Sequence, residues 1–145
     1  MLPASPGVFQ SANSVNVGTF GPLPIAAILK QDGTLVSPQN PARVGETVIA
    51  FVTGLGPTTP SVGTNALPIF GGVPSNVTGQ VIVGIQNAGV PVVFSRLSED
   101  LIGVYLVGFQ IPTGTPVGND VFSIGIVPTG SGTAYYSNPA AIYIQ

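Results

Sequence analysis

The side chains that could carry out acid–base chemistry are few and scattered in this 145-residue chain. Glycoside hydrolysis needs two carboxyl groups held roughly 5 to 10 Å apart. The available carboxyl groups are those of Asp32, Glu46, Glu99, Asp100 and Asp120. Asp32 is explained by a turn, Glu46 begins a strand, and Glu99-Asp100 can pair with Arg96. The chain contains no histidine or cysteine, so neither a Ser-His-Asp triad nor a Cys-His pair can be built. We therefore predict that the protein is not an enzyme.

Loop oxygens are the remaining candidates for metal binding. Gly118-Asn119-Asp120 and Ser98-Glu99-Asp100 could each offer ligands to calcium. Neither stretch alternates acidic residues as a dedicated calcium loop does. The absence of histidine and cysteine also removes the usual zinc and copper ligands. We predict no metal and no cofactor.

Two adjacent tyrosines form the best candidate for ligand contact. If Tyr135 and Tyr136 lie in a strand, one of them must point outward and could stack on a sugar ring. The alternative, which we favour, is a packing pair or an interface. Asn76-Val77-Thr78 matches the acceptor pattern for N-glycosylation and indicates an exposed loop, although a chance match is the simpler reading.

Charged residues are unusually rare. They make up 6% of the chain, against about 25% in an ordinary soluble domain. The three basic residues, Lys30, Arg43 and Arg96, cannot neutralise a nucleic-acid backbone. No apolar run reaches the roughly 18 residues of a membrane-spanning helix. We expect an isolated subunit of this composition to be poorly soluble, and its surface to be covered by other copies of itself.

The elements that must position these residues have the two-residue period of strands, and we find no helical periodicity. Residues 25–37 predict a hairpin around Asp32-Gly33, with a type I′ turn. Residues 46–54 predict a central strand. A second hairpin is predicted from residues 80–86 and 90–97, with Pro91 near an edge or a bulge. Further strands are predicted at 101–111, 120–128 and 140–145, and two short ones within the first twenty residues.

The strand predicted at 101–111 raises a question, because both of its faces are apolar for most of its length. Odd positions carry Tyr105, Val107 and Phe109, whereas even positions carry Val104 and Leu106. One face of a sandwich strand packs on the opposite sheet. Something else must cover the second face.

Several motifs occur together in a recognisable order. They are Pro6-Gly7-Val8-Phe9, residues 27–33 (AILKQDG), Asn40-Pro41-Ala42, residues 53–57 (TGLGP), Gly103-Val104-Tyr105 and Gln110-Ile111-Pro112. In this order the chain resembles the Solibacter-type uncharacterised C-terminal domain family over about nine tenths of its length. The resemblance implies an Ig-like β-sandwich of a secreted bacterial protein, without established catalytic residues. The chain departs from the family in standing alone and in extra residues between Phe9 and Ile25, which favours a free-standing subunit.

Taken together, these features predict an all-β, Ig-like antiparallel sandwich of about seven to nine short strands. Residues 1–24 are predicted to be an extended N-terminal segment and a candidate donor strand, and residues 25–145 to be the sandwich domain. We expect a structural subunit of an extracellular bacterial filament or surface assembly, formed by strand addition and apolar sheet faces. The predicted interface residues are Val8, Phe9, Val15, Val17, Phe20, Tyr105 and Phe109. The alternative is a non-catalytic adhesion or polysaccharide-binding module, with Tyr135 and Tyr136 as the contact residues.

Overall fold

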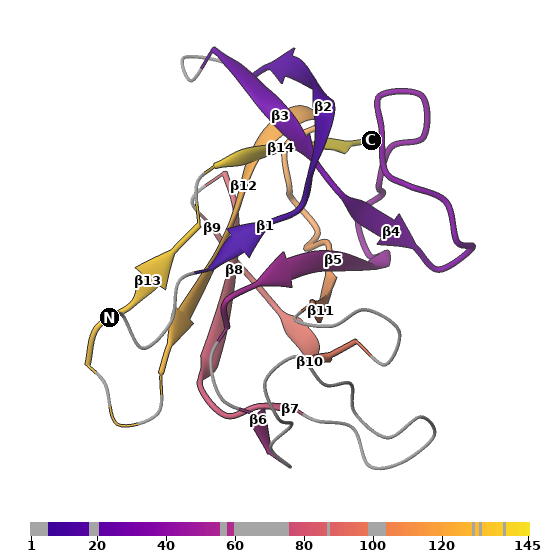
Figure 1. Ribbon diagram of the computed structural model, residues 1–145. Coiled ribbons are helices and arrows are strands. Elements are labelled where there is room, and N and C mark those ends of the chain that lie inside the picture. Colours follow the sequence, from indigo (N-terminus) through magenta and orange to yellow (C-terminus); the bar gives the residue numbers. More distant parts are fainter. Residues whose placement is uncertain are drawn as a thin grey trace.

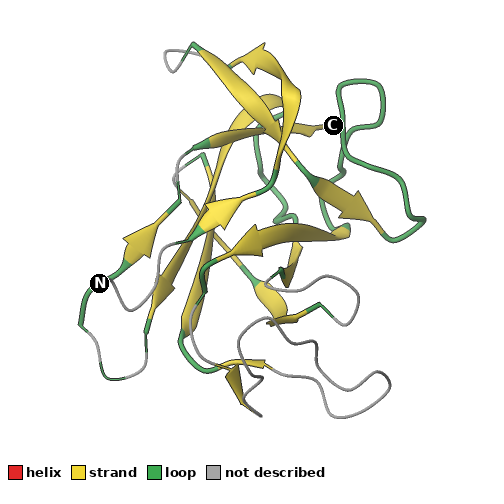
Figure 2. Cartoon of the chain, in the orientation of Figure 1, coloured by secondary structure: helices red, strands yellow, loops and turns green. Residues whose placement is uncertain are grey.

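All regular elements in the described part of the chain are strands (Figure 2). The computed structural model describes residues 6–17, 21–55, 58–59, 76–86, 88–98, 104–128, 130, 132–137 and 139–145. The strands form two sheets that pack face to face (Figure 1). The predicted all-β sandwich is therefore confirmed.

The first sheet is antiparallel and has the order β1-β5-β11-β10-β7-β6, with β4 also paired to β5. Its strands are β1 (Gly7–Val8), β4 (Ile28–Lys30), β5 (Thr47–Thr53), β6 (Thr58–Thr59), β7 (Asn76–Val77), β10 (Val92–Leu97) and β11 (Tyr105–Gln110). Strand β5 has paired neighbours on both sides, so the central strand predicted from residues 46–54 is confirmed.

The second sheet has the order β2-β3-β14-β12-β8-β9, with β13 also paired to β12. Its strands are β2 (Gln10–Asn16), β3 (Pro22–Ala26), β8 (Gln80–Ile85), β9 (Ala88–Val90), β12 (Gly118–Val127), β13 (Tyr135–Tyr136) and β14 (Ala140–Ile144). The pairing of β3 with β14 is parallel and joins them at Ile25 and Ala141. The other pairs are antiparallel.

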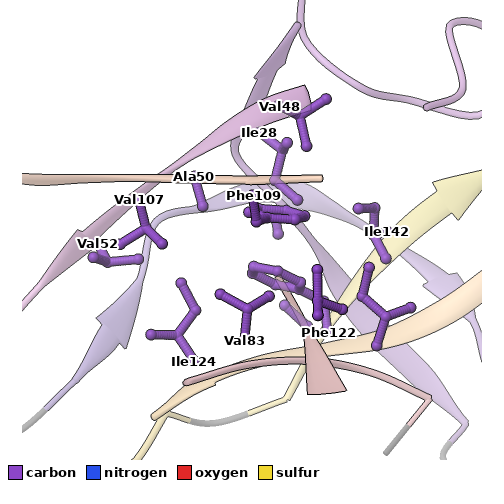
Figure 3. Packing of buried hydrophobic residues seen from close by; sticks show 14 of the residues in the cluster. Ile28, Val48, Ala50, Val52, Val83, Val107, Phe109, Phe122, Ile124 and Ile142 are labelled. Atoms are coloured by element: carbon purple, nitrogen blue, oxygen red, sulfur yellow. The ribbon is translucent and has the colours of Figure 1, made fainter. Parts of the chain in front are cut away.

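The core lies between the sheets and follows from the alternation of side chains along each strand. On β5 the inward residues Val48, Ala50 and Val52 are completely buried, whereas the residues between them are half-buried. Phe109 of β11 stacks on Phe122 of β12 across the sandwich, with ring centroids 5.4 Å apart (Figure 3). This aromatic pair joins the centres of the two sheets.

The second predicted hairpin is correct only in part, because the chain changes sheets within it. Strand β8 turns back into β9 as expected, and Ile85 pairs with Ala88. After Pro91 the chain enters the first sheet, where β10 pairs with β11. The register shifts between Val92 and Phe94, so the interpretation of Pro91 as lying near a bulge is confirmed. Sheet changes of this kind, together with the two-residue strands β6, β7 and β13, give the structure more strands than predicted.

The turn at residues 31–34 reverses the chain as predicted, but its type differs. Gly33 has a φ of 88°, whereas Asp32 does not adopt a positive φ, as a type I′ turn would require. The N–H of Gly33 donates to the carbonyl of Lys30 (3.0 Å), and the Asp32 carboxylate accepts the N–H of Thr34 (3.0 Å). The aspartate side chain bonds the backbone locally, which favours this alternative turn.

Strands of the segment 7–26, here called the arm, belong to both sheets, and the chain returns to the first sheet directly after it. Strand β1 belongs to the first sheet, β2 and β3 belong to the second, and β4 returns to the first. The crossings occur at Phe9 and Ala27, and the N–H of Ala27 donates to the carbonyl of Phe9 (2.7 Å). Strands β2 and β3 lie beside β14 at one end of the molecule (Figure 1). The arm thus closes one side of the sandwich.

Candidate functional site

The outer face of the second sheet has an apolar patch where β12 pairs with β14. Phe122 and Ile124 of β12 point into the core, so the alternate residue Val121 faces outward. Its partner across the strands is Ala141. Both are nonetheless nearly inaccessible, with exposed fractions of 7% for Val121 and 1% for Ala141. Some other element must therefore cover this outward patch.

That element is the arm. Val17, which is 2% exposed, forms a small cluster with Val121 and Ala141, and Val15 and Leu23 pack against it. At the edge of this cluster, the side-chain amide of Asn119 donates to the carbonyl of Asn16 (3.1 Å). Val15 and Val17 thus fill an apolar acceptor site, and here the site belongs to their own chain. We call Val121 and Ala141 the acceptor patch.

The arm is also held by the first sheet. Val8 pairs with Val52 and packs against the main core. The N–H of Phe9 donates to the carbonyl of Phe51 (2.9 Å), and the Phe9 side chain is 40% exposed. The arm therefore contacts both sheets through strand pairing and apolar side chains.

A hollow of about 450 Å³ extends the same outer face beyond the acceptor patch. Val121 lies at the boundary, since it lines the hollow and also touches the arm cluster. Ile82, Gly84, Ser123 and Tyr136 are among the other lining residues. Ile82 and Gly84 pair with outward residues of β12, so they belong to this face. The arm covers one part of the outer face and leaves this part open.

The two tyrosines of β13 point in opposite ways, as predicted. Tyr135 packs against the core, whereas Tyr136 is 60% exposed. The Tyr136 ring lies over Gly125, where a Cβ atom would come within 2.6 Å of the ring. A glycine at position 125 therefore lets the ring lie against the sheet at the edge of the hollow.

The second face of β11 is covered by a neighbouring strand. A Cβ atom at Gly108 would lie 2.4 Å from the Phe94 ring, so this ring occupies the space over the glycine. The guanidinium of Arg96 lies over the same ring, 4.5 Å from its centroid. Over this part of β11, the second apolar face is therefore covered by a side chain of the same chain.

The predicted interface residues divide between the arm and the core. Phe109 is completely buried and Tyr105 is half-buried against the same core. The assignment of Phe109 to a subunit interface is therefore wrong, because odd positions of β11 face the opposite sheet. Phe20 lies outside the described residues. Asn76 is exposed, as the glycosylation pattern indicated, but it begins β7 rather than lying in a loop.

Asp120 is a buried carboxyl group that the sequence offered only as a possible calcium ligand at the start of a predicted strand. It is 2% exposed, and its Oδ2 atom has no hydrogen-bond partner in the described part of the chain. Burial raises the pKa of this group from 3.8 to about 6, because ionisation would put a charge in apolar surroundings. The available signal was its position, two residues before Phe122, which places both side chains on the core face of β12.

The other described carboxyl groups have local partners. The Glu46 carboxylate lies 3.5 Å from the Lys30 ammonium and accepts the N–H of Arg43 (3.0 Å). Hydrogen bonds from Thr34 lower the pKa of Asp32. Glu99 and Asp100, with their predicted ion pair to Arg96, lie outside the described residues. Among the described residues, no three carboxyl side chains lie close enough together to hold a metal ion.

No family model, no curated protein and no solved structure matches this chain. The resemblance to the Solibacter-type family therefore stays a prediction. No helix within the described residues is long and apolar enough to cross a membrane.

Proposed function

We propose that the protein is a structural subunit that self-associates into an extracellular filament or surface assembly. The observation that carries this proposal is the outer face of the second sheet, which is apolar and only partly covered by the chain's own arm. The hollow beside Val121 remains open, next to the exposed ring of Tyr136. A neighbouring copy that covered this face would remove apolar surface from water. Each Å² buried in this way would stabilise the assembly by about 25 cal/mol.

The rest of the surface supports the same proposal. Val117 is 74% exposed, Val93 is 59% exposed and Leu35 is 55% exposed. The chain carries a net charge of only -2, so little electrostatic repulsion opposes association. Under this proposal the subunit has a mechanical rather than a catalytic role, and its partners are other copies of itself.

Electron microscopy and sedimentation of untagged protein test the proposal. We expect fibres or sheets at micromolar concentration, and a monodisperse 14.6 kDa species would contradict it. Val93→Lys replaces exposed apolar surface by charge and should reduce assembly. The matched control is Gln31→Lys, which adds the same charge at an exposed turn residue and should leave assembly unchanged.

A second candidate function is non-catalytic binding of a polysaccharide, and Tyr136 favours it. Its ring rests on Gly125 and is exposed beside a hollow that also contains the Ser123 side chain. An aromatic ring held flat in this way can stack on a sugar ring. If the protein is such a module, Tyr136→Ala should weaken binding to immobilised polysaccharide at least tenfold. The control is Leu35→Ala, which changes an exposed apolar residue distant in sequence from Tyr136. It should not weaken binding to the polysaccharide.

A further inference from the structure

The arm is attached to the domain through contacts that a second copy could supply equally well. Its strand pairing joins Val8 to Val52, and its apolar cluster places Val17 with Val121 and Ala141. Each of these contacts joins the arm to the remainder of the chain, residues 27–145. An arm from another copy would form the same contacts and leave nothing newly exposed. Exchange of identical elements is a low-cost route to association for this reason.

The junction between arm and domain is suited to opening. Strands β3 and β4 are separated by Ala27 alone, and they lie in different sheets. Residues 25–30 read IAAILK, five apolar residues and a lysine without glycine or proline, and by itself this stretch predicts one continuous strand. Straightening at Ala27 breaks its hydrogen bond to Phe9 and carries the arm away from its own acceptor patch.

We propose that the arm is exchanged between copies, so that the arm of one subunit occupies the acceptor patch and the β5 edge of the next. This inference rests on the proposed self-assembly and names the segment that joins the copies. In the monomer the arm competes with arms of other copies as an intramolecular ligand. Exchange therefore prevails at high protein concentration, and a chain of such exchanges propagates when the rotation between copies does not close.

A disulfide between the arm and the domain reports which copy supplies the arm. Because Phe9 and Phe51 are hydrogen-bonded, the next pair, Val8 and Val52, lies at a non-hydrogen-bonded position of the ladder. Cα atoms at such positions are about 4.5 Å apart, within the range that a disulfide spans. The chain has no cysteine of its own, so the variant Val8→Cys/Val52→Cys contains the only two thiols.

The variant is first assembled under reducing conditions and then oxidised. Exchange predicts a ladder of covalently linked copies on a non-reducing denaturing gel. The reverse order, oxidation of dilute monomer before concentration, should lock the arm onto its own chain and reduce assembly at least tenfold, with recovery on reduction. The control Thr47→Cys/Gln110→Cys links β5 to β11 within the domain, again at a non-hydrogen-bonded pair. On the non-reducing denaturing gel it should run as a monomer. It should assemble equally well before and after oxidation.

Two outcomes separate this inference from the proposed function. If wild-type protein forms no assembly at all, the proposed function fails. If it assembles but the oxidised variant contains only linkages within one chain, exchange is overturned and self-assembly stands. Should the cysteine at buried Val52 prevent folding, Asn16→Cys/Asn119→Cys places the thiols near the surface for a short bismaleimide linker. The Asn119 side chain already reaches the Asn16 carbonyl, and the same gel readout applies.

Discussion

Replacing Asp120 by asparagine should stabilise the fold at neutral pH. The carboxyl group is buried, and its Oδ2 atom lacks a partner among the described residues. Ionisation therefore costs more in the folded chain than in the unfolded chain, where water solvates the charge. Asparagine keeps the size and shape of the side chain but cannot ionise, so the substitution removes the pH-dependent part of this cost.

The magnitude follows from the pKa. Burial raises the pKa of Asp120 from 3.8 to about 6, a difference of about 2 units, and each unit corresponds to about 1.4 kcal/mol. Below pH 3.8 both states hold the proton and the group carries no penalty. As the pH rises from 3.8 through about 6, the unfolded chain has already lost its proton and the folded chain has not, so stability falls. Above that range the wild-type protein is less stable than Asp120→Asn by about 3 kcal/mol.

Urea unfolding at pH 4, 5.5 and 7 measures this difference. The other carboxyl groups titrate in both chains, so their contributions cancel when the wild type is subtracted from the variant. We expect near equality at pH 4 and a gain of about 3 kcal/mol at pH 7, a large share of the roughly 5 to 15 kcal/mol of a typical domain. Asp32→Asn should behave in the opposite sense, because hydrogen bonds lower the pKa of Asp32. A variant advantage that is the same at pH 4 and pH 7 would refute the reasoning.

Three further predictions concern the core, β11 and the arm. Phe109→Ala removes one ring of the stack with Phe122 and should cost about 3 to 5 kcal/mol in urea unfolding. Gly108→Val forces a side chain into the space of the Phe94 ring and should cost about 1 to 3 kcal/mol by the same measurement. Deleting residues 1–20 removes β1, β2 and Val17 from the arm, and should abolish assembly in sedimentation while circular dichroism still reports a β-rich fold.

The strands themselves could be predicted from the sequence, because their alternation of side chains is local. Alternate residues of β5 and of β14 lie in the core, in keeping with the two-residue period of a strand. The sheet to which a strand belongs could not be predicted. One residue, such as Ala27 or Pro91, is enough to move the chain from one sheet to the other, and the choice depends on partners far away in sequence.

For the candidate site, the sequence predicted which arm residues insert into an apolar acceptor, but not where in the fold that acceptor lies. Val15 and Val17 were identified as residues that fill an apolar acceptor, and the structure gives them one on β12 and β14. The location of the acceptor depends on the parallel pairing of β3 with β14 at Ile25 and Ala141, which leaves no local sign in the sequence. Phe109 was misassigned for a related reason. When both faces of a strand are apolar, the period alone does not say which face is the core.

Exchange of the arm also makes growth directional, and Val121→Lys tests that direction. The substitution places a charge in the acceptor patch, yet the backbone of residue 121 keeps its two hydrogen bonds to Gln86. Such a chain still has an arm but cannot receive one. Added to wild-type protein, it should insert its arm into the open end of a growing assembly and then stop growth, so that mean length falls as its mole fraction rises. Gln31→Lys, with the same added charge, should not shorten the assemblies.

Combining Val121→Lys with deletion of residues 1–20 makes this test decisive. The doubly altered chain keeps only β3 of the arm and has no working acceptor patch, so exchange predicts that it stays in the supernatant and leaves assembly length unchanged. If copies were joined instead through the open hollow on the outer face, this chain would still carry the surface that docks into the hollow of another copy. It would therefore still bind to the end of an assembly and stop its growth. Shortening by the doubly altered chain would therefore rule out the arm as the element that links the subunits.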